Sequence, residues 1–254
     1  MPADNTQRFS NRAAAYVAGR PGFPAALVEQ LAAAGALRRG ATVVDLGAGT
    51  GLSAEPFLRA GHAVIGVEPN DAMRAAGAEY LARYAGYRAV AGRAEATGLP
   101  AGCAQLVVAG QAFHWFEPQA ARCEALRVLA PRGWAALFWN ERERDSTPFM
   151  AGYEQLCRDF SPEYALVRDR DGDESTIAEF FGGQAPARRE LAHKRPMTWE
   201  QLAALASSVS YLPAAGTAAH APMQAALRAL FDACAQDGAI EMRYVCRLYA
   251  APLT

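Results

Sequence analysis

The chain has 254 residues, of which 52% are hydrophobic and 20% charged, and this ordinary globular composition excludes disordered and collagen-like architectures. Its 25 basic and 26 acidic residues give a net charge of -1. The basic excess expected of a nucleic-acid-binding protein is therefore missing, and we expect no nucleic-acid partner.

The first two thirds of the chain alternate short apolar runs with helical stretches. Such alternation predicts a parallel sheet that is covered by helices on both faces. A helix is expected first at Ala25–Leu37, after the break Pro21-Gly22-Phe23-Pro24. The expected strands are Thr42–Leu46, Ala63–Val67, Tyr87–Ala91, Gln105–Ala109 and Trp134–Trp139, and the helices between them are Ser53–Ala60, Asp71–Tyr84 and Gln119–Leu129.

The last third follows a different pattern. A helix is expected at Pro148–Phe160, and the charged run 168–174 is expected to form a loop. Two further strands, Arg188–Met197 and Glu241–Ala250, flank the expected helices Trp199–Ser207 and Pro222–Gln236. Because no linker or repeat interrupts the chain, we expect one domain over residues 1–254, with an arm or lid at 1–39, a core at 40–145, and last strands with a substrate cap at 146–254.

A glycine-rich loop is the sharpest local pattern. The strand Thr42–Leu46 is followed by Gly47, Gly49 and Gly51, and then by a helix. Glycines at such a turn let the backbone approach a ligand without a Cβ in the way. Glu68 ends the next strand, 17 positions after Gly51, where a carboxylate can accept both hydroxyls of a ribose. Together the loop and Glu68 indicate a nucleoside-containing cofactor.

The charge beside the loop indicates which cofactor this is. Asp45 lies two residues before the first glycine, and Leu52 stands where a dinucleotide fingerprint would continue. A carboxylate so close to a helix N-terminus would repel a pyrophosphate, whereas it suits a cationic ligand. S-adenosylmethionine, with its sulfonium and ammonium groups, fits this pattern better than NAD.

Four segments together resemble the class I S-adenosylmethionine-dependent methyltransferases, in the group called methyltransferase type 11. They are Asp45-Leu46-Gly47-Ala48-Gly49-Thr50-Gly51, Val67-Glu68-Pro69-Asn70, Gly92-Arg93-Ala94-Glu95-Ala96-Thr97-Gly98-Leu99-Pro100 and Leu126-Arg127-Val128-Leu129-Ala130-Pro131-Arg132-Gly133, where Arg132 replaces the group's usual glycine. The resemblance covers roughly residues 41–140. It implies an α/β, doubly wound, Rossmann-like sheet of seven strands, mostly parallel with one antiparallel strand, plus an N-terminal helical arm and a C-terminal helical insertion.

The resemblance also assigns cofactor contacts. It implies that the backbone of Gly47, Ala48 and Gly49 contacts the methionine part and that the carboxylate of Glu68 binds the ribose. Ala94 and Glu95 would contact the adenine. From the residues alone, Glu95 could equally be a solvated carboxylate on a polar turn. The remaining cofactor-binding candidates are Asp45, Gly51, Pro69 and Gln111.

The substrate side lies after the fourth expected strand, at Gly110-Gln111-Ala112-Phe113-His114-Trp115-Phe116. In open α/β sheets ligands bind beyond the carboxyl ends of the strands, so this stretch should face the reacting methyl group. The Asn/Asp-Pro-Pro-aromatic motif of enzymes that methylate amino groups is absent here. The His-Trp pair instead resembles a branch of trans-aconitate-type methyltransferases. His114 is the tentative catalytic residue, although it could serve packing instead. Trp115 and the pair Trp139-Asn140 at the end of the fifth expected strand are pocket candidates, and Trp115 too could simply pack under the following helix.

Two segments outside the core also resemble that branch. Tyr16 and Arg20 belong to an N-terminal signature that would fold over the cofactor, and Tyr211 belongs to an insertion that would roof the substrate. A surface helix with a proline stop is the alternative for the first segment. The expected function is therefore S-adenosylmethionine-dependent methylation of a small organic molecule at an oxygen atom, with S-adenosylhomocysteine as product. The alternatives are an NAD-dependent oxidoreductase and a non-catalytic protein that only binds S-adenosylmethionine.

Location and metal content follow from residue usage. The five cysteines are widely spaced and odd in number, without a Cys-x-x-Cys pair, so we expect no disulfide framework and no metal site. No apolar run suits export or reaches the roughly 18 residues of a membrane helix. The expectation is a cytoplasmic protein without a membrane partner, and the pattern leaves its oligomeric state open.

Overall fold

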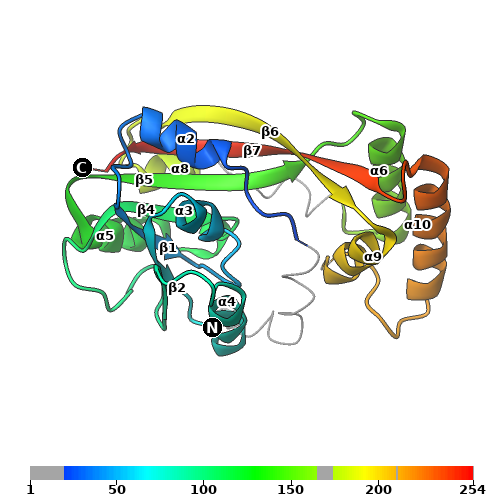
Figure 1. Ribbon diagram of the computed structural model, residues 1–254, viewed down its shortest axis with the longest axis horizontal. Coiled ribbons are helices and arrows are strands. Elements are labelled where there is room, and N and C mark those ends of the chain that lie inside the picture. Colours follow the sequence, from blue (N-terminus) through cyan, green and yellow to red (C-terminus); the bar gives the residue numbers. More distant parts are fainter. Residues whose placement is uncertain (1–19, 165–173, 210, 254) are drawn as a thin grey trace.

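Seven strands form one sheet in the computed structural model, which describes residues 20–164, 174–209 and 211–253 (Figure 1). The strand order is β3-β2-β1-β4-β5-β7-β6. The first five strands are parallel to their neighbours, whereas β7 is antiparallel to both β5 and β6. This confirms the expected mostly parallel sheet with one antiparallel strand. The strands are β1 Thr42–Leu46, β2 Ala63–Val67, β3 Tyr87–Val90, β4 Ala104–Gly110, β5 Leu129–Arg142, β6 Ala187–Met197 and β7 Ile240–Pro252.

Helices cover both faces of the sheet. One apolar core lies between the sheet and the helices α5 and α8, and a second lies against α2, α3 and the end of α4. The helices are α2 Ala26–Ala33, α3 Glu55–Arg59, α4 Asp71–Tyr80, the 3-10 turn η3 Phe113–Trp115, α5 Pro118–Val128, α6 Pro148–Phe160, α8 Glu174–Phe180, α9 Trp199–Ser208 and α10 His220–Cys234. None of the helices in the described ranges is long and apolar enough to cross a bilayer.

Side-chain caps explain where several helices begin. The Asn70 side chain accepts a hydrogen bond from the Met73 amide at the start of α4, and Thr147 does the same for Met150 at the start of α6. Thr198 and Gln201 form a reciprocal capping box at the start of α9. These caps account for the agreement between the expected and observed starts of α4, α6 and α9.

The strands β5, β7 and β6 extend well beyond the rest of the sheet. Figure 1 shows α6, α9 and α10 gathered around their far end. These helices bury a third apolar core against Met197, Ile240, Met242 and Tyr244. The C-terminal helical insertion is thus built on the same sheet as the expected cofactor loop.

Some details differ from the sequence expectations: α2 and α4 end earlier than expected, at Ala33 and Tyr80. The strand β5 begins at Leu129 rather than Trp134, because Leu129 pairs with Ala104 before an irregularity carries the pairing to Trp134 and Leu106. Arg132 lies within that irregularity at φ 64, the left-handed conformation that glycine adopts without strain. The helix α8 begins at Glu174, the last residue of the expected charged loop, and the other residues of that loop lie outside the described residues.

Candidate functional site

The loop after β1 turns sharply under the carboxyl end of the sheet. Gly47, Gly49 and Gly51 all have positive φ, between 54 and 84. A Cβ on Gly47 would lie 2.7 Å from the Cβ of Ala112, so the β4–α5 connection packs directly on this turn. A Cβ on Gly51 would lie 2.4 Å from Leu81 instead. The first glycine therefore brings two loops together, while the third allows α4 to pack close to the loop.

Glu68 fastens this loop to the end of β2. Its carboxylate accepts hydrogen bonds from the backbone amides of Gly49, at 2.9 Å, and Asn70, at 2.8 Å. Burial raises the pKa of Glu68, and these two amide bonds oppose the rise. An ionised carboxylate offers about four acceptor positions, so Glu68 retains capacity for ribose hydroxyls while holding the loop. Pro69 follows on the exposed side of this turn.

Asp45 is fully buried beneath the loop. Ser53 donates a hydrogen bond from its hydroxyl to Oδ2 of Asp45 at 2.6 Å, whereas Oδ1 has no hydrogen-bond partner among the described residues. The hydroxyl of the nearby Thr50 is also unpartnered there. Burial raises the pKa of Asp45 to about 7. A cation close to Asp45 would stabilise its ionised form, so this unpartnered carboxylate oxygen fits a positively charged cofactor such as S-adenosylmethionine.

The adenine-side candidates lie on a tight turn between β3 and β4. Arg93 and Ala96 pair across the turn, which buries Ala94 in the core and leaves Glu95 half-buried. Oε1 of Glu95 accepts a hydrogen bond from the backbone amide of Glu117 at 3.0 Å. Glu95, the residue expected to contact the adenine, thus also ties the turn to the start of α5.

The β4–α5 connection presents the expected substrate-side residues. Gln111 has a φ of 61, and its backbone amide donates to the carbonyl of Phe138 at 3.0 Å. Phe113 is buried in the core, whereas His114 and Trp115 lie outward on η3. The Trp115 side chain is 42% exposed, and its ring lies 4.8 Å from that of His114. This pair is therefore accessible to a ligand at the edge of the sheet.

The remaining substrate-side candidates are placed differently from one another. Trp139 is only 2% exposed and packs its ring against Phe113 and Tyr249 inside the core. Tyr211 is half-buried, with its ring 5.1 Å from that of Tyr164. Tyr16 lies outside the described residues. Trp139 therefore packs in the core, whereas Tyr211 remains a candidate for the substrate side.

Arg20 and Tyr211 come from opposite ends of the chain, yet the charge of Arg20 acts on the Tyr211 hydroxyl. Burial raises the pKa of Tyr211, and the positive charges of Arg142 and Arg20 partly offset this rise. Arg20 also acts in the same way on Tyr244 of β7. The Arg20 backbone itself is held on β6, where Arg195 donates to its carbonyl at 2.7 Å.

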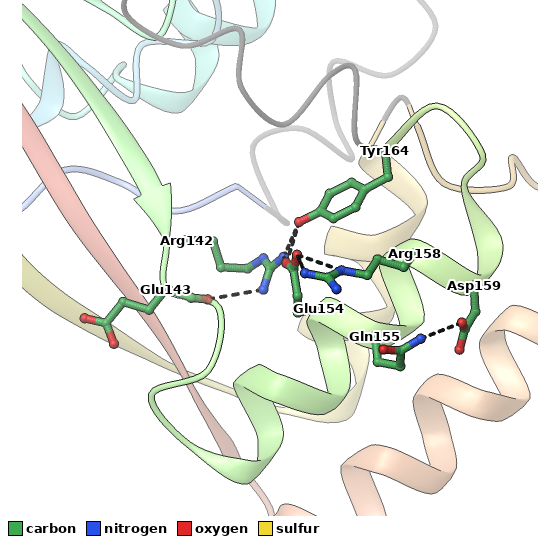
Figure 2. A network of polar contacts seen from close by, with 7 residues as sticks. All are labelled: Arg142, Glu143, Glu154, Gln155, Arg158, Asp159 and Tyr164. Atoms are coloured by element: carbon green, nitrogen blue, oxygen red, sulfur yellow. Dashed lines mark hydrogen bonds and ion pairs between the residues drawn. The ribbon is translucent and has the colours of Figure 1, made fainter.

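A buried polar network beside this region was missed by sequence reasoning. Figure 2 shows Arg142, at the end of β5, donating to a carboxylate oxygen of Glu154 at 2.6 Å and to the hydroxyl of Tyr164 at 2.7 Å. The Tyr164 hydroxyl in turn donates to the same Glu154 oxygen at 2.6 Å. The network ties β5 to α6. In the sequence, the one signal of this network is Arg142, which follows an apolar strand. The expected strand Trp134–Trp139 ended before this residue.

Gly77 was also missed as a residue that shapes the site, whereas Asn140 was expected only as a pocket candidate beside Trp139. Gly77 lies on the face of α4 that packs against the glycine loop, where an added Cβ would be 3.0 Å from the carbonyl oxygen of Gly49. Asn140 accepts a hydrogen bond at its backbone oxygen from Nε2 of Gln111 at 3.1 Å. A glycine inside an otherwise helical pattern is a signal of close approach that could have identified Gly77.

Comparisons with known proteins agree with this geometry. A family model described as a methyltransferase domain matches residues 44–137. The chain is 32% identical over 212 residues to an uncharacterized methyltransferase of Mycobacterium tuberculosis, covering 82% of this chain and 79% of that one. It is 28% identical over 217 residues to an uncharacterized methyltransferase-like protein of Schizosaccharomyces pombe, covering 80% and 78% of the two chains.

Solved structures show the same fold. A putative type II methyltransferase from Anaeromyxobacter dehalogenans superposes with a TM-score of 0.69 at 22% identity, covering 92% of this chain and 98% of that chain. Geranyl diphosphate C-methyltransferase from Streptomyces coelicolor, in a complex that contains S-adenosyl-L-homocysteine, superposes with a TM-score of 0.50 at 15% identity and covers 90% and 74%.

Proposed function

This chain belongs to the class I S-adenosylmethionine-dependent methyltransferases, and from that premise we propose that it methylates a small organic acid at oxygen. The protein is an enzyme with S-adenosylmethionine as its cofactor and S-adenosylhomocysteine as its product. The family excludes the alternative of an NAD-dependent oxidoreductase. The acceptor and the residues assigned to it below are our proposal.

The cofactor contacts follow from the loop geometry. We assign the backbone of Gly47, Ala48 and Gly49 to the methionine part, and the spare acceptor positions of Glu68 to the ribose hydroxyls. Asp45 would face the cofactor's positive charge, for which its unpartnered oxygen is suited. When bound, S-adenosylmethionine supplies a methyl group that is already activated for transfer, so the protein has no leaving group to protonate.

Adenine recognition would fall to the turn that carries Ala94 and Glu95. Because one Glu95 oxygen already accepts from the Glu117 amide, an exocyclic amine would have to use the remaining lone pairs of that carboxylate. Gln111 completes the proposed set from the β4 side, together with Gly51 and Pro69 at the two neighbouring turns.

Arg20 carries the proposal for the acceptor, because Arg195 of β6 holds its backbone carbonyl at 2.7 Å and its positive charge acts on Tyr211. A guanidinium can hold a planar carboxylate through two parallel hydrogen bonds, which a lysine ammonium cannot do. The exposed His114 and Trp115 offer an imidazole and an aromatic surface on the β4 side of the same end of the sheet. The resemblance of this His-Trp pair to trans-aconitate-type enzymes supports the same class of substrate.

The chain's contribution to the reaction is chiefly one of positioning. Bringing a nucleophile to about 3 Å from the methyl carbon, in line with the bond that breaks, can supply roughly 7–11 kcal/mol of the barrier. A carboxylate oxygen attacks without losing a proton, in which case His114 and Arg20 would orient it. A hydroxyl acceptor would need a general base, and His114 is the candidate because an imidazole titrates near neutrality.

A pair of measurements on Arg20→Lys tests the acceptor assignment. A panel of small carboxylic acids is first screened for transfer of labelled methyl from S-adenosylmethionine. With an acid that is a substrate, the variant should raise KM about tenfold with a smaller change in kcat, because one hydrogen bond of ground-state binding is lost. S-adenosylhomocysteine affinity should stay unchanged. A weakened affinity would instead assign Arg20 to the cofactor's own carboxylate, and no change in either would refute both roles.

Three broader assignments accompany this function. We propose the division into an arm at 1–39, a core at 40–145 and a cap-bearing remainder at 146–254. The five free cysteines support a cytoplasmic location. The nearly balanced charge supports a small-molecule substrate over a nucleic acid.

A further inference from the structure

Asn140, near the end of β5, joins three separate segments of the chain. Its buried side chain, 7% exposed, donates from Nδ2 to the backbone carbonyl of Gly22 at 3.0 Å. Its Oδ1 lies 2.8 Å from Nε2 of His193 on β6. Its backbone oxygen accepts from the Gln111 side chain. The N-terminal arm, the β6 strand and the β4–α5 connection therefore meet at this one residue.

The hydrogen bonds also define the orientation of the Asn140 amide. A carbonyl such as that of Gly22 can only accept, so it must face the Nδ2 group, and Oδ1 must then face His193. Nε2 of His193 is therefore the donor in that contact. The imidazole is held in turn by stacking on the ring of Tyr244, with centroids 5.4 Å apart. His193 thus fixes the orientation in which Asn140 can hold the arm.

The arm segment Arg20–Phe23 depends on a few such anchors. It forms no helix or strand, so no ladder of backbone hydrogen bonds holds it. Arg195 on β6 donates to the carbonyl of Arg20 at 2.7 Å, and the Phe23 ring packs edge-on against Phe138 with centroids 4.7 Å apart. Together with Asn140, these contacts dock the segment on β5 and β6.

Direct contacts link this docked segment to the cofactor end of the sheet. Phe138, beneath Phe23, lies against Gly110, where an added Cβ would be 2.6 Å from the Phe138 ring. The same Cβ would be 2.7 Å from Ser53, the residue that donates to Asp45. Three successive packing contacts, from Phe23 to Phe138, to Gly110 and to Ser53, thus join the segment to the residue that donates to the buried carboxylate.

We propose that Asn140 is a positioning residue for methyl transfer, which docks the segment Arg20–Phe23 at the cofactor site and slows release of the cofactor product. Gln111 is placed by the same residue, so the β4 side of the site and the arm keep a fixed relation to each other. The proposal rests on the family's cofactor and does not depend on which acceptor is methylated.

The test measures the affinity and dissociation rate of S-adenosylhomocysteine in purified full-length variants, beside their unfolding midpoints. Asn140→Ala removes both side-chain bonds and should weaken affinity about tenfold, chiefly through faster dissociation. Lys194→Ala is the matched control, because Lys194 is next to His193 on the same strand but pairs with Glu241 at an exposed position. It should leave S-adenosylhomocysteine binding unchanged.

Two comparisons separate positioning from general stability. Asn140→Ala and Arg195→Ala each release the same segment, so the double variant should lose much less S-adenosylhomocysteine affinity than the sum of the two single losses. His193→Gln, which keeps a side-chain N–H donor, should bind within about twofold of the wild type, whereas His193→Phe, which keeps only the ring, should lose affinity as Asn140→Ala does.

The outcomes decide the proposal in each case. Wild-type affinity in a folded Asn140→Ala protein, or full additivity with Arg195→Ala, would overturn it. If Asn140→Ala does not fold, the two His193 variants decide, and equal affinity in both would overturn the proposal. Failure to find an acidic substrate would refute the acceptor assignment while leaving these binding measurements unaffected.

Discussion

Replacing Glu68 tests the cofactor site most directly, since this carboxylate has two tasks. In the structure it accepts from the amides of Gly49 and Asn70, and in the proposed complex it also accepts from the ribose. Each charge-assisted hydrogen bond contributes roughly 1.5–3 kcal/mol. Glu68→Ala should therefore weaken S-adenosylhomocysteine binding by about 2–3 kcal/mol, or roughly 30- to 150-fold, even if the loss of the ribose contacts is partly compensated by water.

A second substitution separates the loop from the ribose. In Glu68→Gln one carboxylate oxygen becomes an amide group that cannot accept, so one of the two backbone amides must lose its partner. We expect this variant also to lower the free energy of unfolding, by about 1 kcal/mol. Isothermal titration and urea denaturation measure the two effects, with Glu79→Gln on the exposed face of α4 as the control. Wild-type affinity in Glu68→Ala would refute the assignment of Glu68 to the cofactor.

Three further predictions concern the loop and the network beyond β5. Burial raises the pKa of Asp45 to about 7, so the folded, cofactor-free protein binds the carboxyl proton of Asp45 more tightly than the unfolded chain does. The free energy of unfolding should therefore fall as the pH rises from about 4 to 7. Urea titrations of Asp45→Asn should lack this dependence on pH. Gly77→Ala should weaken S-adenosylhomocysteine binding several-fold despite a better helix propensity, since the new methyl group would press on the Gly49 carbonyl; calorimetry would show it. Glu154→Gln should lower the free energy of unfolding in denaturant by about 3 kcal/mol, because it leaves the buried Arg142 without its carboxylate partner. Burial would raise the pKa of Glu154, but hydrogen bonds from Tyr164 and Arg142 outweigh this effect and lower the pKa, so the contribution of Glu154 to stability should fade as the pH falls below about 4.5. The control Glu163→Gln, at an exposed position, should show neither effect.

The parts of the fold that were predictable are those encoded over short distances. The glycine loop, the strand before it and Glu68 at the end of the next strand form one local pattern, and the structure joins Gly49 to Glu68 by a hydrogen bond. The starts of α4 and α6 follow from Asn70 and Thr147, which are adjacent to the helices they cap. Such features depend on backbone preferences and capping within a few residues.

The unpredicted parts depend on contacts between distant segments. The full length of β5 arises from pairing of Leu129 with Ala104, across an irregularity that reads as a turn in sequence. Asn140 owes its importance to Gly22 and His193, neither of which has a pattern that links it to β5. Trp139 was a reasonable pocket candidate at a strand end, but which face of the strand its ring occupies depends on register, and it lies in the core.

The position of β7 in the sheet has a consequence for synthesis of the protein. This strand lies between β5 and β6, yet it follows both of them in the chain. While a ribosome is translating the intervening residues, β5 ends at Arg142 with an open edge that no later strand can cover until Ile240 and its successors emerge. An unpaired edge of this length is a template for association with other chains. We therefore expect nascent chains stalled before Ile240 to be captured by chaperones that recognise exposed strands, and released once β7 has inserted.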